Sequence, residues 1–128
     1  MTATVNAPRV ILVAEDDEDI LKLVAVALAG EGYEIDTAAD GEEALGCLST
    51  RRPDLAVLDL RMPRIDGFEV SRRIREGADT RDVPVILLTA LVEGKDIARG
   101  FDAGATDYVK KPFSPSDLVA RVKRILGR

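Results

Sequence analysis

Hydrophobic residues along the chain follow two alternating patterns, short continuous runs and longer segments with helical spacing. The continuous runs predict strands buried on both faces, where polar alternation is not needed. These runs cover residues 10–14, 55–58 and 83–88, and two further strands are expected at 33–38 and 108–109. The segment 33–38 alternates polar and apolar residues, which is typical of an edge strand. Pro84 lacks an N–H donor, so it should lie at the start or edge of its strand.

Apolar residues spaced three and four apart predict a helix after each strand. The stripes lie at 20–28, 68–74, 97–101 and 118–126, and another helix is expected to begin at Asp40. Asp40 and Glu43 have the spacing of a capping box, while Ser114 followed by Pro115 is typical of a helix start. Strand and helix therefore alternate five times, which predicts an α/β fold of (βα)₅ type. Its parallel sheet would be doubly wound, with helices on both faces.

Composition narrows the possible functions. The 128 residues suit one domain, and no apolar run is long enough to cross a membrane. Histidine is absent, which excludes Ser-His-Asp and Cys-His catalysis. The net charge of -5 argues against direct binding of nucleic acid, whose backbone is also negative. Cys47 is the one cysteine, so no internal disulfide can form, and a cytoplasmic location is expected.

Several chemically active side chains are expected at the carboxyl ends of the strands, where open α/β sheets bind their ligands. Glu15 and Asp16 follow the first strand, Asp59 the third, Thr89 the fourth and Lys111 the fifth. Carboxylates gathered in one place repel each other unless a cation joins them. Mg²⁺ fits a few carboxylates together with water and a phosphate. The sequence therefore predicts a magnesium site at this edge.

Other residues have plainer interpretations. Asp17 could be a helix cap or part of the site, and the sequence favours neither. Phe101 and Phe113 are expected in the core.

Four motifs in this order resemble the receiver domains of two-component response regulators. They are Val13-Ala14-Glu15-Asp16-Asp17, Val57-Leu58-Asp59-Leu60-Arg61-Met62-Pro63 with Asp66-Gly67, Leu88-Thr89-Ala90, and Tyr108-Val109-Lys110-Lys111-Pro112-Phe113. Each motif alone is weak, but the set with its spacing is specific. The resemblance covers residues 9–126, leaving 1–8 as an expected flexible tail. It also implies the flavodoxin-like strand order 2-1-3-4-5.

The resemblance implies a role for each site residue. Asp59 would accept the phosphoryl group, and Glu15, Asp16, Asp59 and the backbone carbonyl of Arg61 would bind Mg²⁺. Thr89 would hydrogen-bond the phosphoryl oxygens, and Lys111 would pair with Asp59. The Lys111–Pro112 peptide bond is usually cis in this family. Such a domain would catalyse only its own phosphorylation and dephosphorylation.

The resemblance also implies a conformational switch. Thr89 would be drawn toward the phosphoryl group, Tyr108 would turn into the vacated space, and the loop 91–95 would move with them. The changed face would comprise the fourth helix, the fifth strand and the fifth helix, where a downstream protein would bind. A sensor histidine kinase or a phosphotransfer protein would act upstream. The domain would be a monomer or a phosphorylation-dependent dimer.

The sequence departs from the common family pattern at three positions. Glu15 stands where aspartate is more frequent, although its longer side chain can still reach a metal. Lys110 adds a cation beside Lys111 and is expected to face solvent, since strand neighbours point to opposite faces. Leu91 is apolar at a position that influences hydrolysis. We expect Leu91 and Arg61 to crowd the attacking water and slow dephosphorylation.

Two other classes remain open from the residues alone. A metal-dependent phosphatase or hydrolase could use an acid after a parallel strand. However, such enzymes usually need a general acid two residues beyond the nucleophile, where Arg61 stands, and a lid. An inactive receiver that binds partners without phosphate is the third class, although all the required residues are present. The chain could be a stand-alone regulator or a piece of a longer one with an output domain.

Overall fold

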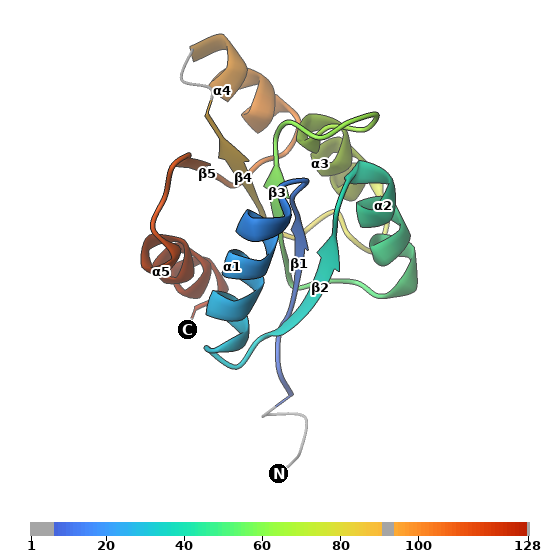
Figure 1. Cartoon of the computed structure of the whole chain (residues 1–128). Helices are drawn as coiled ribbons and strands as arrows, with labels where there is room; N and C mark the ends of the chain where they lie inside the picture. Colours follow the sequence, from blue (N-terminus) through green and yellow to red (C-terminus); the bar gives the residue numbers. More distant parts are fainter. Residues whose placement is uncertain (1–6, 91–93, 128) are drawn as a thin grey trace.

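The computed structural model describes residues 7–90 and 94–127, which form a five-stranded parallel sheet between two layers of helices (Figure 1). The strands are β1 (Val10–Ala14), β2 (Glu34–Ala38), β3 (Leu55–Asp59), β4 (Val85–Thr89) and β5 (Asp107–Lys110). The helices are α1 (Glu18–Ala29), α2 (Gly41–Thr50), α3 (Gly67–Glu76), α4 (Gly94–Asp102) and α5 (Pro115–Leu126). The strand order β2-β1-β3-β4-β5 confirms the predicted (βα)₅ fold.

Details of the sheet follow from the sequence pattern. β3 and β4 are buried along their whole length, as their continuous apolar runs predict. β2 lies at the edge, in agreement with its alternating pattern. Pro84 precedes β4, so its missing donor costs the sheet nothing, and its carbonyl accepts from Ala56 N at 3.0 Å. The apolar run of β3 ends at Asp59, and that of β4 ends at Thr89. Both residues therefore lie at the carboxyl edge of the sheet.

The hydrophobic core has two parts, one on each face of the sheet. The first packs α1 and α5 against the sheet through residues such as Val24, Leu28 and Val122. The second packs α2 and α3 through Ala44 and Ile74. Figure 1 shows the same division, with α1 and α5 on one side and α2 and α3 on the other. Successive side chains of a strand point to opposite faces, so they enter the two parts of the core in turn.

Helix starts follow the cap signals of the sequence. Asp40 accepts from Glu43 N at 2.8 Å, while the Glu43 side chain accepts from Ala39 N, one residue before the usual capping-box donor. Ser114 accepts from Asp117 N at 3.0 Å, with Pro115 opening α5.

Glycine allows a close approach between α2 and the loop that follows β3. A Cβ atom on Gly41 would overlap the carbonyl oxygen of Ile65 and lie 2.7 Å from its Cβ. In the same loop Arg64 has a left-handed backbone (φ 67°), and its guanidinium lies 2.8 Å from the Asp40 carboxylate. The loop carrying Arg61 is therefore held in place by the start of α2.

The described part of the chain tests three predictions about single residues. Phe101 is 50% exposed, so its assignment to the core is wrong: it lies at the surface of α4, with its ring against Tyr108. Phe113 is partly buried and packs against the α1–α5 side of the core. Lys110 is exposed, as predicted. Leu91 and most of the loop 91–95 lie outside the described residues.

Within residues 7–90 and 94–127, no helix is long and apolar enough to cross a membrane.

Candidate functional site

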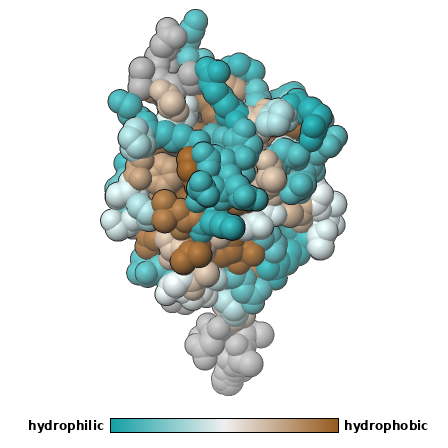
Figure 2. Space-filling model, in the orientation of Figure 1, coloured by the Kyte–Doolittle hydropathy of each residue, from teal (hydrophilic) through white to brown (hydrophobic). Residues whose placement is uncertain are grey.

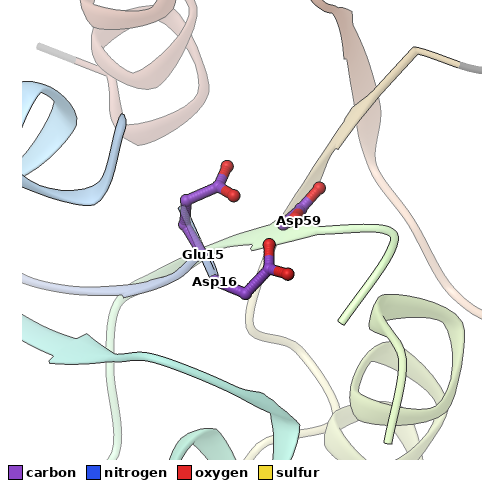
Figure 3. Close-up of side chains that lie close together, drawn as sticks. All are labelled: Glu15, Asp16 and Asp59. Atoms are coloured by element: carbon purple, nitrogen blue, oxygen red, sulfur yellow. The ribbon is translucent and has the colours of Figure 1, made fainter. Parts of the chain in front are cut away.

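Three acids meet at the carboxyl edge of the sheet (Figure 3). Glu15 and Asp16 directly follow β1, and Asp59 ends β3, which is the neighbouring strand. One carboxylate oxygen from each lies within 4.8 Å of the other two. The predicted grouping of these side chains is therefore present in the structure.

Glu15 is an unusual acid because it is completely buried. Its Oε2 accepts from Asp17 N at 3.1 Å, and its Oε1 lies 3.0 Å from Lys111 Nζ. The latter contact is an ion pair, and it is shared, since the same ammonium also contacts Asp59. A buried carboxylate oxygen in this position has the capacity to bind a further cation.

Lys111 joins the two buried acids. Its Nζ donates to Asp59 Oδ1 at 3.1 Å while contacting Glu15, and its side chain is 21% exposed. The cis Lys111–Pro112 bond follows β5, as the resemblance implies. Burial acts to lower the pKa of Lys111, but contact with Glu15 and Asp59 outweighs burial and raises that pKa. The ammonium is therefore charged at every physiological pH.

The environment of Asp59 opposes its ionisation. Burial is the largest cause, followed by the nearby Glu15 and Asp16 carboxylates, and Lys111 acts in the opposite direction. Together they raise the pKa of Asp59 to about 7. Because burial and the neighbouring acids disfavour its negative charge, the ionised Asp59 would be stabilised by a second cation beside it.

The acids and Lys111 fit a divalent metal ion. Three carboxylates and one ammonium leave two negative charges in the ionised site. Oxygen donors at this spacing suit a hard ion such as Mg²⁺, which retains several waters and takes few protein ligands. The raised pKa of Asp59 shows that these acids would be stabilised by a further cation beside Lys111.

The acids and Lys111 line one surface pocket together with Arg61 and Thr89. Asp17 also reaches its rim, but its side chain caps α1, accepting from Asp19 N at 3.0 Å. Its cap interpretation thus has direct support. Tyr108 is not among the lining residues of this pocket; its hydroxyl instead contacts α4.

One feature of the site could not be read from the sequence. The ion pair between Glu15 and Lys111 joins residues from opposite ends of the chain, and no spacing rule predicts it. The sequence indicated that both would lie at the same edge, but not that Glu15 would be more deeply buried than Asp59.

Comparison with known proteins identifies the family. The model of the response regulator receiver domain matches residues 11–123. PhoP of Bacillus subtilis strain 168, an alkaline phosphatase synthesis transcriptional regulatory protein, is 46% identical over 118 residues, which are 92% of this chain and 48% of that protein. The chain thus spans about half the length of the curated relatives it matches.

Solved structures of the same family share this fold. The chemotaxis protein CheY4 of Vibrio cholerae superposes with a TM-score of 0.89 at 33% identity, covering 93% of this chain and 99% of that one. The receiver domain of sensor histidine kinase PA1611 from Pseudomonas aeruginosa PAO1, solved with a magnesium ion in its active site cleft, gives 0.85 at 33% identity, covering 95% of this chain and 100% of that one.

The fold and the acidic site define a signalling domain of two-component systems. The chain belongs to the family of response regulator receiver domains, which are phosphorylation-activated switches. This assignment favours the switch over the hydrolase considered from the sequence.

Proposed function

We propose that Asp59 accepts a phosphoryl group in a reaction that requires Mg²⁺, and that Lys111 and Thr89 assist it. The observation that carries the proposal is the contact of Asp59 with Lys111 at 3.1 Å, inside a cluster of acids that fits a divalent ion. Under this proposal the chain catalyses only its own phosphorylation and dephosphorylation.

The proposed reaction transfers the phosphoryl group from a histidine of the donor protein to Asp59. A carboxylate oxygen of Asp59 attacks phosphorus in line, a P–O bond to Asp59 forms, and the P–N bond to the donor histidine breaks. The electron pair of that bond remains on the imidazole nitrogen. Charge spreads over the three equatorial oxygens, so catalysis depends on positioning and on cations. The product is an acyl phosphate, which water can hydrolyse to reset the switch.

Each residue of the pocket has a proposed part in this step. Glu15, Asp16, Asp59 and the backbone carbonyl of Arg61 would hold Mg²⁺, which when bound supplies positive charge to the phosphoryl oxygens. Lys111 lies next to Asp59 and would move its ion pair to a phosphoryl oxygen once Asp59 is esterified. Thr89 is buried at the wall of the pocket, and its hydroxyl would donate a hydrogen bond to another phosphoryl oxygen.

A sensor histidine kinase or a phosphotransfer protein would supply the phosphoryl group. Such a donor must bring a histidine to the mouth of the pocket, so it must bind a surface of this domain next to the pocket. Ile20, Leu23, Pro112 and Phe113 line an apolar hollow that shares Lys111 with the pocket. Leu23 is 50% exposed, and hydrophobic side chains gather over the α1–α5 face in Figure 2. This face would receive the donor.

The output is proposed to leave through α4, β5 and α5, after Thr89 and Tyr108 change position. A downstream protein would bind there, and the domain would act as a monomer or a phosphorylation-dependent dimer. Relatives such as PhoP are transcriptional regulators of about twice this length, so any DNA contact would belong to an output region rather than to this acidic domain. We expect the domain to act in the cytoplasm.

Intact-mass measurement with a small phosphodonor tests the proposal. Incubation with acetyl phosphate and Mg²⁺ should add one phosphoryl group to the wild type, and omission of Mg²⁺ should prevent it. Asp59→Asn should show no adduct because it cannot form the acyl phosphate. Asp54→Asn is the matched control, since Asp54 directly precedes β3, at the end opposite to Asp59, and accepts a hydrogen bond from Val10 N. An adduct that persists in Asp59→Asn would refute the proposal.

A further inference from the structure

Tyr108 lies against the backbone of α4 at Gly100. Its hydroxyl donates to the carbonyl oxygens of Asp96 at 2.8 Å and Ile97 at 3.1 Å. A Cβ atom on Gly100 would overlap the Tyr108 hydroxyl and lie 2.5 Å from Cζ. It would also lie 3.1 Å from Leu87 Cδ1, so the space has a second wall. The absence of a side chain at Gly100 therefore creates a notch that holds the ring.

The backbone of α4 does not itself require glycine at this position. Gly100 is not among the positive-φ glycines, which are Gly32, Gly104 and Gly127. A glycine in a helix interior costs about 1 kcal/mol relative to alanine. Contact with Tyr108 and Leu87 is thus the structural reason for glycine here.

The notch also has an aromatic side wall. The rings of Phe101 and Tyr108 meet edge to face, with centroids 5.3 Å apart and an interplanar angle of 71°. Phe101 is half exposed, so this wall of the notch lies at the protein surface. A hydroxyl hydrogen bond shared between the two carbonyls and one ring contact therefore hold Tyr108 on α4.

The notch is connected to the phosphorylation pocket through β4. Tyr108 pairs with Leu87, and Lys110 pairs with Thr89. Since side chains two apart point to the same face, Tyr108 and Thr89 lie on the same side of the sheet. A displacement of Thr89 toward a phosphoryl group would therefore open space on the side where Tyr108 lies.

We propose that Gly100 sets the balance of the switch by providing the notch that holds Tyr108 on α4 in the unphosphorylated form. This inference rests on the proposed function. A side chain at position 100 removes the notch and so destabilises that form relative to the phosphorylated one. By linkage, the affinity for a phosphoryl analogue must then increase by the same factor. Gly100 contacts neither the donor nor Asp59, so it is a positioning residue.

Gly100→Ala with beryllofluoride and Mg²⁺ tests this inference. Beryllofluoride is a tetrahedral phosphoryl analogue, and its half-saturating concentration should fall by about fivefold or more in the variant. The chain has two tyrosines and no tryptophan. Tyr33→Phe therefore leaves Tyr108 as the single site for 3-fluorotyrosine, and its ¹⁹F resonance should shift in Gly100→Ala toward that of the saturated parent protein.

Two controls separate the notch from a general effect of alanine in a helix. Gly46→Ala in α2 adds a Cβ that meets nothing within 4 Å, so the affinity should not change. In a Tyr108→Ala background, Gly100→Ala should have no effect, because the ring that it displaces is gone. Equal affinity in Gly100→Ala and its parent would overturn the inference while leaving the proposed function intact. Loss of binding in the parent itself would instead overturn both.

Tyr108→Phe gives a second measurement that adds no atom to the notch. It removes the hydroxyl bonds to the carbonyls of Asp96 and Ile97, so the half-saturating concentration should again fall, by about twofold or more. If Gly100→Ala does not fold, this variant still tests whether the contact of Tyr108 with α4 stabilises the unphosphorylated form. An unchanged or higher half-saturating concentration in Tyr108→Phe would then overturn the inference.

Discussion

Replacing Lys111 by methionine should lower the free energy of unfolding by about 3 kcal/mol at pH 8 without divalent cations. Glu15 and Asp59 would lose the cation that lies 3.0 and 3.1 Å from their oxygens. The loss should shrink as the pH falls through about 7, where protonation of Asp59 relieves its repulsion with Glu15. Added Mg²⁺ should restore part of the stability, since it replaces some of the missing positive charge. Urea denaturation at several pH values measures these changes.

The same variant should slow phosphorylation by about 100-fold, because one of the two cations expected to stabilise the transition state is missing. Intact-mass time courses with acetyl phosphate at saturating Mg²⁺ measure the rate. Lys110→Met is a matched control, since Lys110 is exposed and makes no ion pair within the described part of the chain. Its stability should stay within about 0.5 kcal/mol of the wild type. Similar losses in both variants would contradict the assigned role of Lys111.

The sequence predicted the fold well because each signal was local and repeated. The continuous run Val10–Ala14 can be buried only in a central strand, and it is β1 of the structure. Asp40 and Ser114 are caps whose bonds reach only three residues along the chain. Once strands and helices alternate, the carboxyl edge of the sheet is determined, and the residues that follow the strands meet there.

The remaining features depend on contacts between distant residues, which periodicity does not report. Phe101 has the spacing of a core residue, but α4 presents it to solvent beside Tyr108. Glu15 is completely buried, and its carboxylate contacts both Asp17 N and Lys111, a residue far away in the sequence. The notch at Gly100 exists only because β5 brings Tyr108 against α4. A glycine in a helical pattern does not by itself show whether a neighbour lies close: Gly100 meets Tyr108, whereas Gly46 in α2 has nothing within 4 Å.

Asp59→Asn should make the protein more stable than the wild type at pH 8 in the absence of divalent cations, by on the order of 2 kcal/mol. The pKa of Asp59 is raised to about 7 in the folded chain, from an ordinary value of 3.8. Between these values the folded protein holds a proton that the unfolded chain has released. The stability from this group is therefore complete below about pH 4 and is lost as the pH rises through about 7. Asparagine is neutral throughout, so it never incurs this loss.

Chemical denaturation from pH 4 to 8 measures the difference between the two proteins. The curves should coincide near pH 4 and separate with increasing pH, and Asp82→Asn, at an exposed position, should follow the wild type. Mg²⁺ at pH 8 should stabilise the wild type much more than Asp59→Asn, so the gap should narrow or reverse. An Asp59→Asn protein that is less stable than the wild type at pH 8 without metal would show that the ion pair with Lys111 outweighs burial and the neighbouring acids. The site would then bind its cation because of the geometry of its oxygens, and relief of repulsion would contribute little.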